Sequence, residues 1–202
     1  IDPTPDDLIV TLGDYVDRGP KSKEVLEYLS QLRSRCRLIP ILGNHDDMFL
    51  QAIRGSHRKA FLSMGGDATL RSYGGSTSEL NYALVPRGHI AFLESCVNYF
   101  ETETHFFLHA SYVSTLPLAD QPILALRWES LRDEIPPPHF SGKTAIVGHT
   151  SQKNGKILNK GYLVCIDTNC AGGGWLTAVD IHSGRIWQAS REGKLRGKLR
   201  TV

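Results

Sequence analysis

Four short apolar runs in this sequence each lead directly into polar residues. Short apolar runs bounded by glycine or polar residues are typical of buried strands, and ligands of open α/β sheets bind beyond the carboxyl ends of the strands. The pattern therefore predicts one crevice lined by carboxylate, amide and imidazole groups. The four runs are residues 8–12, 38–42, 106–108 and 144–147. The polar groups that follow them are Gly13-Asp-Tyr-Val-Asp-Arg-Gly19, Gly43-Asn-His-Asp46, His109-Ala110 and Gly148-His-Thr150.

Each polar group also has an ordinary structural explanation. An Asp before a turn usually caps the next helix, and Asn44 followed by His45 can form a simple turn. A lone His at a strand end is more often a buried core residue than a ligand. These explanations do not account for metal-capable side chains at all four strand ends. Mixed oxygen and imidazole ligands suit divalent Mn, Fe or Zn, so the joint pattern favours a metal site.

The order of predicted elements indicates the fold class. Strands and helices alternate in the first half of the chain, and the second half is rich in strands. We therefore expect one layered α/β domain over residues 1–190, followed by a basic C-terminal tail over residues 191–202. Helices are predicted from Ser22, as the cap, to about Arg33, from Asp47 to Ile53, in part of residues 65–75, and from Pro86 to about Asn98. Further strands are predicted at residues 162–166, 175–181 and 185–189, the last two joined by a hairpin turn.

Composition and charge exclude several classes of protein. Apolar residues make up 41% and charged residues 22% of the 202 residues, which is ordinary globular usage. Lys and Arg number 23 against 21 Asp and Glu, so the charge gives no case for a nucleic-acid or membrane partner. No apolar run approaches the roughly 18 residues of a membrane span. The four cysteines form no C-x-x-C pair, and we expect reduced thiols in a cytoplasmic protein.

In motifs and in their order, the sequence resembles the phosphoprotein phosphatase branch of the calcineurin-like metallophosphoesterases over about residues 8–180. The most specific motif is Gly-Asp-x-x-Asp-Arg-Gly at residues 13–19. Residues 65–74, 124–128 and 165–168 further resemble bacterial members, which include serine/threonine phosphatases and symmetrical diadenosine tetraphosphatases. The resemblance implies a layered α/β/β/α sandwich.

The resemblance also implies a dinuclear site of two divalent metal ions, with Mn as the expected metal and Fe or Zn as alternatives. Asp14 would bridge the two ions. Asn44, His109 and His149 would complete the protein ligands of the second ion. His45 would be the general acid that protonates the leaving alkoxide, since His is the side chain poised to give a proton near pH 7.

Three further residues are expected to assist this chemistry. Asp17 would orient His45, and Arg18 would grip the phosphate with its guanidinium fork. Relatives use a later Arg on the phosphate, and Arg127 is the best match here. Trp128 directly follows that Arg, whereas relatives often have a Trp two residues before it.

The sequence departs from the family at its beginning. Relatives start with a Gly-Asp-x-His-Gly motif on a first strand, whose Asp and His bind the first metal. Only twelve residues precede Gly13, and they contain nothing similar. We therefore expect this chain to lack the family's first strand and helix, which leaves the first metal site incomplete. We also expect the natural protein to carry an Asp-x-His segment upstream of Ile1.

Three functions follow as hypotheses. The first is a metal-dependent phosphomonoester hydrolase acting on phosphoserine or phosphothreonine, whose partner is a phosphoprotein or a small phosphoester. The second is symmetrical hydrolysis of diadenosine tetraphosphate at the same metal site. The third is a non-catalytic pseudophosphatase that serves as a binding module.

Overall fold

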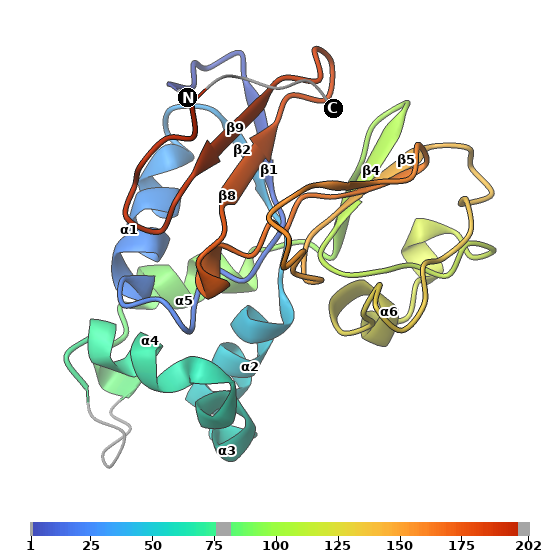
Figure 1. The fold of residues 1–202 in the computed structure, drawn as a ribbon. Coiled ribbons are helices and arrows are strands. Elements are labelled where there is room, and N and C mark those ends of the chain that lie inside the picture. The colour runs from blue at the N-terminus through green and yellow to red at the C-terminus, as the bar shows by residue number, and fades with distance from the viewer. Residues whose placement is uncertain (1, 76–81, 198–202) are drawn as a thin grey trace. The chain divides into compact units, whose positions relative to one another are not determined.

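The computed structural model describes residues 2–75 and 82–197. They form two compact units, residues 2–98 and residues 99–197, which we call the N-terminal and the C-terminal unit (Figure 1). Each unit has its own cluster of buried apolar side chains. A single domain over residues 1–190 stays a prediction. In the described part of the chain, none of the helices combines the length and the apolar character needed to cross a membrane.

The N-terminal unit begins with a strand-helix-strand segment. Strands β1 (Leu8–Thr11) and β2 (Arg37–Pro40) pair in parallel, and helix α1 (Ser22–Leu32) lies between them in the chain. These elements confirm the two predicted strands and the first predicted helix. The predicted cap is wrong, because Lys21 occupies the N-cap position and Ser22 is the first helical residue. The hydroxyl of Ser22 is instead 3.2 Å from that of Thr69.

Helix α2 (Asn44–Ile53) begins three residues before the predicted start at Asp47. The reason is a capping interaction: the carboxylate of Asp46 accepts a hydrogen bond from the backbone N–H of Gly43 at 3.0 Å. The other helices of this unit are α3 (Arg58–Phe61), a π-helix over Leu62–Gly66, α4 (Asp67–Ser72), a 3-10 helix over Tyr82–Leu84 and α5 (Arg87–Glu94).

Helix α5 ends before the predicted boundary at Asn98. The chain leaves the helix because Val97 forms an isolated bridge with Ile41, just beyond the end of β2. The backbone N–H of Val97 donates to the carbonyl of Pro40 at 2.9 Å. These bonds join the segment between β2 and α2 to the segment that follows α5.

The C-terminal unit contains a mixed sheet of five strands in the order β3-β4-β5-β7-β6. Strands β4, β5 and β7 are parallel neighbours, as Figure 1 shows for β4 and β5. Because parallel strands end at the same edge, residues that follow β4 and β5 lie close together. The strand bounds are β3 (Tyr99–Glu101), β4 (His105–Leu108), β5 (Thr144–Val147), β6 (Leu158–Asn159) and β7 (Leu163–Cys165).

Strands β8 (Leu176–Val179) and β9 (Ile186–Ala189) form the predicted hairpin. Residues after β9 turn back onto it, since the guanidinium of Arg196 donates to Gln188 at 2.9 Å. Residues 198–202 of the predicted basic tail lie outside the described residues. The unit also contains helix α6 (Ile123–Arg127) and two 3-10 helices, Leu118–Asp120 and Cys170–Gly172.

Candidate active site

The loop after β1 holds three predicted site residues in left-handed backbone conformations. Asp14, Asp17 and Arg18 have φ angles of 58°, 73° and 62°. His149, after β5, has a φ of 58°, so four of the six non-glycine residues with positive φ in the described ranges are predicted site residues. Such conformations cost about 1–3 kcal/mol each and cluster at functional sites. The backbone strain therefore marks these loops independently of their side-chain chemistry.

Asp46 fixes the loop after β1 against the start of α2. Its fully buried carboxylate accepts backbone N–H bonds from Asp14 at 2.7 Å, Tyr15 at 2.9 Å and Gly43 at 3.0 Å. Burial and the neighbouring charge of Asp14 raise the pKa of Asp46 well above its usual value, and the three N–H bonds oppose that rise. The carboxylate of Asp46 thus fixes the strained loop after β1 through hydrogen bonds to its backbone.

Gly43 allows the close approach of this loop. A Cβ atom at this position would overlap both the backbone nitrogen and the Oδ1 atom of Asp14. The Oδ1 atom of Asp14 is also 3.3 Å from the backbone nitrogen of His45, which donates to it. The carboxylate of Asp14 consequently lies at the first turn of α2, the turn that carries the buried side chains of Asn44 and His45.

A buried pair of side chains joins this loop to α2. The Nδ1 atom of His45 is 2.7 Å from Oδ2 of Asp17, and the two side chains are 2% and 0% exposed. The hydroxyl of Thr69 donates to the other carboxylate oxygen of Asp17 at 2.7 Å and accepts from its backbone N–H at 2.8 Å. Burial raises the pKa of Asp17, while the bonds from His45 and Thr69 work in the opposite direction.

The other nitrogen of His45 contacts Arg18. The guanidinium Nη2 of Arg18 is 2.7 Å from Nε2 of His45. Because a guanidinium can only donate, Nε2 accepts this bond and the ring proton is on Nδ1, facing Asp17. The backbone N–H of Arg18 donates to the carbonyl of Gly65 at 3.1 Å. His45 is thus held between a carboxylate and a guanidinium.

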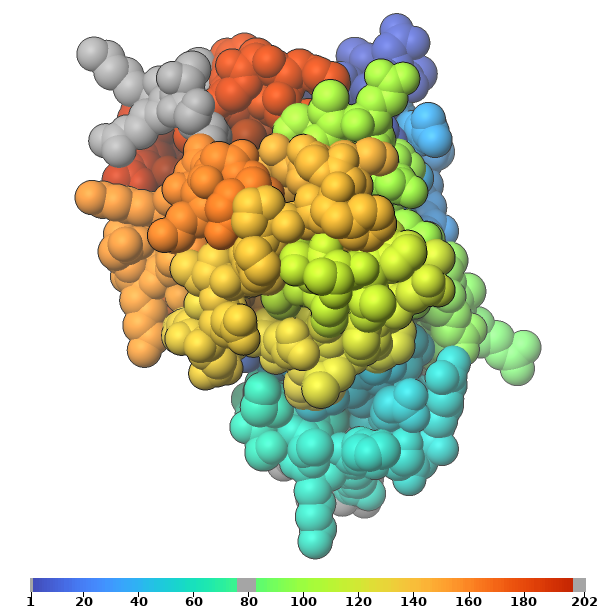
Figure 2. Space-filling view, turned by 90° about the vertical axis from the view of Figure 1, so that its right-hand side faces the viewer, coloured from blue at the N-terminus to red at the C-terminus, as the bar shows by residue number. Residues whose placement is uncertain are grey.

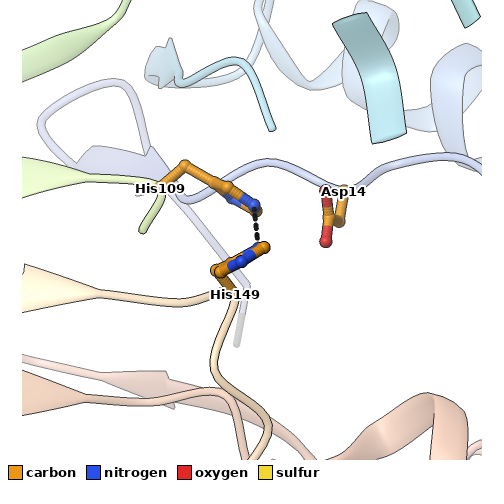
Figure 3. Close-up of side chains that lie close together, drawn as sticks. All are labelled: Asp14, His109 and His149. Atoms are coloured by element: carbon orange, nitrogen blue, oxygen red, sulfur yellow. Dashed lines mark hydrogen bonds between the residues drawn. The ribbon is translucent and has the colours of Figure 1, made fainter. Parts of the chain in front are cut away.

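In the C-terminal unit, two imidazoles meet beyond the parallel strands β4 and β5. Figure 3 shows His109 and His149 facing one another, with Nε2 of His109 3.2 Å from Nδ1 of His149. Two nitrogens each bound to one divalent ion at about 2.1 Å lie roughly 3.0–3.4 Å apart for angles between 90° and tetrahedral. The separation therefore fits two ligands of one metal ion.

The remaining predicted site residue, Arg127, ends helix α6 in the same unit. The carbonyl of the next residue, Trp128, is 3.2 Å from Nε2 of His149 and orients that ring. A backbone carbonyl that holds the second nitrogen of a ligating His is a frequent arrangement around metal sites. Backbone bonds from Ala110 to Leu126 and from Ser111 to Ala125, both 2.9 Å long, join the loop after His109 to α6.

Two residues of the N-terminal site were not assigned a role from the sequence. Asp46 stands within the Gly43-Asn-His-Asp46 motif, and its spacing from Gly43 is that of a capping box, which could have revealed it. Thr69 lies in the stretch of residues 65–74 that resembles bacterial relatives, and that resemblance was its only signal. The structure brings five predicted residues together in the N-terminal unit. In the C-terminal unit it brings His109 and His149 together, and Arg127 lies at the end of α6, whose backbone is bonded to the loop after His109.

Segments of the chain are similar to two curated bacterial enzymes. A stretch of 61 residues, 30% of this chain, is 38% identical to serine/threonine-protein phosphatase 2 of Escherichia coli, of which it covers 26%. A stretch of 57 residues, 28% of this chain, is 49% identical to the symmetrical bis(5'-nucleosyl)-tetraphosphatase of Photorhabdus laumondii, of which it covers 20%. The matches therefore span about a quarter or less of the length of either relative.

A solved structure is similar over nearly the whole chain. The cold-active protein-tyrosine phosphatase of a psychrophilic Shewanella species matches with a TM-score of 0.63 over 94% of this chain and 68% of that chain, at 17% identity. This likeness concerns the fold. A family model for the calcineurin-like phosphoesterases matches residues 1–161. The motifs, the fold and this match agree, and the chain belongs to the calcineurin-like phosphoesterase family, with the fold of that family.

Proposed function

We propose that this protein hydrolyses phosphate monoesters, with phosphoserine or phosphothreonine in proteins as its substrate. The observation that carries the proposal is the buried contact of Asp17 with His45, whose far nitrogen accepts a bond from Arg18. An acid-base imidazole beside a phosphate-binding guanidinium suits transfer of a proton to the leaving oxygen of a phosphoester. A similar stretch in the Escherichia coli serine/threonine phosphatase supports the choice of substrate.

We propose that Asp14, Asn44, His109 and His149 hold a divalent metal ion, with Asp14 shared with a second ion. The donor set of carboxylate, amide and imidazole groups fits Mn, with Fe and Zn as alternatives. The 3.2 Å separation of the two imidazole nitrogens supports a common ligand role for His109 and His149. When bound, divalent ions supply positive charge to the phosphate oxygens and make a bound water more acidic.

Arg18 would change partners when substrate binds. A phosphate dianion attracts the guanidinium more strongly than a neutral imidazole does, because it accepts two parallel charge-assisted hydrogen bonds. Moving Arg18 to the phosphate would free Nε2 of His45 to take up a proton from water, which the ring would then donate to the leaving oxygen. Arg127 would provide a second cation for the phosphate.

Asp17 would keep the imidazole in a fixed orientation through the reaction. Its carboxylate accepts from Nδ1 of His45, so a proton carried on Nε2 faces away from Asp17. A doubly protonated ring would be stabilised by this buried carboxylate. A pseudophosphatase used only for binding gains nothing from this arrangement, which is why we favour an enzyme.

Symmetrical hydrolysis of diadenosine tetraphosphate is the second candidate. It is favoured by the stretch that is 49% identical to the symmetrical tetraphosphatase of Photorhabdus laumondii. We further propose a cytoplasmic location, since all four cysteines are free thiols.

The test compares a phosphoserine peptide with diadenosine tetraphosphate, side by side, for the Mn²⁺-loaded and the chelated protein. We expect faster turnover of the peptide, loss of activity on chelation and recovery when Mn²⁺ is restored. Faster turnover of the dinucleotide would select the second candidate. No metal-dependent turnover of either substrate contradicts both.

A further inference from the structure

The C-terminal unit contains a cavity of about 390 Å³ that none of the proposed catalytic residues lines. It lies between the segment after α6 and the segment after His149, whose gold and orange surfaces adjoin on the face in Figure 2. Two of its lining side chains are cations, Arg132 and Lys153, and no acidic residue of the described chain lines it. The remaining lining residues are Leu131, Ile135, Thr150, Ser151, Gln152, Asn154 and Leu158.

Hydrogen bonds hold together the two segments that line this cavity. The buried hydroxyl of Thr150 accepts a hydrogen bond from the backbone N–H of Leu131 at 2.9 Å, which joins the two segments. Nη2 of Arg132 donates to the carbonyl of Ser151 at 2.6 Å. A backbone carbonyl therefore holds the guanidinium in place without neutralising its charge.

Neither cation of the cavity has an acidic partner. Over residues 2–75 and 82–197, Arg132 and Lys153 form no ion pair. The carboxylate of Asp167 is nearby, but it accepts bonds from the hydroxyl of Ser151 and the backbone N–H of Asn169, both at 2.9 Å, and does not line the cavity. Asp133 and Glu134 are exposed and do not line it either.

We propose that this cavity binds a compact oxyanion, a phosphate or carboxylate group. A guanidinium held in place offers the donor fork that such groups accept in pairs, and Lys153 adds a second, point-like charge. Thr150 directly follows His149 in the chain, so the occupant would lie beside the loop that carries a proposed metal ligand. The bound oxyanion is either a second anionic group of the substrate or free phosphate. The first of these, a role in substrate binding, rests on the proposed function.

Binding is tested without turnover, by titrating pyrophosphate into metal-free protein in a calorimeter. Arg132→Ala and Lys153→Ala should each raise the dissociation constant about threefold or more, as loss of one solvent-accessible charge contact predicts. The matched control Lys160→Ala removes an exposed lysine of the same unit that does not line the cavity, and it should change nothing. Arg18→Ala, which removes the proposed phosphate contact of the active site, separates binding of pyrophosphate there from binding in the cavity.

Three results overturn the proposal: no binding of pyrophosphate, equal binding by both cavity variants and wild type, or loss of binding only in Arg18→Ala. Lys153→Ala keeps the test decisive if Arg132→Ala fails to fold, since Lys153 is exposed.

Enzyme kinetics then distinguish the two possible occupants, a substrate group and free phosphate. A second anionic group on the substrate predicts a raised KM for diadenosine tetraphosphate in Lys153→Ala, with an unchanged KM for p-nitrophenyl phosphate. Free phosphate as the occupant predicts altered phosphate inhibition with both substrates. Absence of any turnover would contradict the proposed function and leave the calorimetric result standing.

Discussion

Nδ1 of His45 lies 2.7 Å from Oδ2 of Asp17, and solvent reaches neither side chain to more than 2%. Asp17 comes from the strained loop after β1, and His45 from the first turn of α2. The contact therefore depends on the fold of the whole N-terminal unit. It also fixes which nitrogen of His45 could serve a substrate, because Nδ1 faces Asp17 and only Nε2, the partner of Arg18 in this structure, points elsewhere.

Replacing His45 with Asn should lower kcat far more than it raises KM. General acids contribute typically about 10²–10⁴-fold, and the loss should shrink for p-nitrophenyl phosphate, whose leaving group scarcely needs a proton. The measurement is kcat for phenyl phosphate and p-nitrophenyl phosphate. His57→Asn is the matched control, since His57 is exposed and has a left-handed backbone that Asn tolerates. Equal losses on both substrates would count against the acid role.

Thr69→Val should reduce both activity and stability. Thr69→Ser keeps the hydroxyl and should retain both. Val leaves the backbone N–H and one oxygen of Asp17 without their partner in a buried site, which costs about 1–3 kcal/mol of unfolding free energy. Losing the bond from Thr69 also removes an effect that lowers the pKa of Asp17, so that pKa should rise further.

The pH dependence of activity provides a second measurement of the contact between Thr69 and Asp17. Activity needs Asp17 as a carboxylate, so the acid limb of kcat/KM should move to higher pH in Thr69→Val. An unchanged acid limb with reduced stability would make Thr69 a purely structural residue.

Arg18→Ala should raise KM and weaken inhibition by free phosphate by about tenfold or more, because a charge-assisted bidentate contact is lost. Arg58→Ala provides the control, as Arg58 is an exposed arginine of the same unit. The inhibition constant of phosphate is measured for all three proteins. Identical constants for wild type and Arg18→Ala would assign Arg18 to the contact with His45 alone.

Gly43→Ala should destabilise the protein by about 1–3 kcal/mol, because the added Cβ overlaps Asp14 while the backbone angles of −85° and 169° suit alanine. The cost is therefore steric. Gly88→Ala, in α5, adds a Cβ with nothing within 4 Å and should stabilise by about 0.5–1 kcal/mol. Urea denaturation measures the change in unfolding free energy of both variants. Equal stability of the two variants would show that the loop gives way at no cost.

The sequence predicted the strand ends well, because the short apolar runs before Gly13, Gly43 and His109 have one plausible role in a sheet. It could not predict how the loops beyond them are held. The contacts of Asp46 with Asp14 and of Thr69 with Asp17 join residues 32 and 52 positions apart. Only folding of the intervening helices brings such residues together.

The elements that sequence reasoning missed are the shortest. Helix α6 has five residues and β6 has two, so neither shows a period of apolar residues that could be recognised. Their formation depends on neighbouring strands and loops. The left-handed conformation of Asp14, Asp17 and Arg18 could not be predicted from the sequence either, since nothing in these residue types requires a positive φ.

Asp14, Asn44, His109 and His149 are the proposed ligands of a divalent ion, and metal binding tests them most directly. Calorimetric titration of Mn²⁺ into wild type, Asn44→Ala and His109→Ala tests these ligands. His182→Ala, an exposed histidine of the C-terminal unit, is the control. Both ligand variants should lose at least the roughly 10–100-fold of Mn²⁺ affinity that removal of a ligand's outer-shell partner costs, and the control should match wild type. Unchanged affinity in either ligand variant would contradict the account.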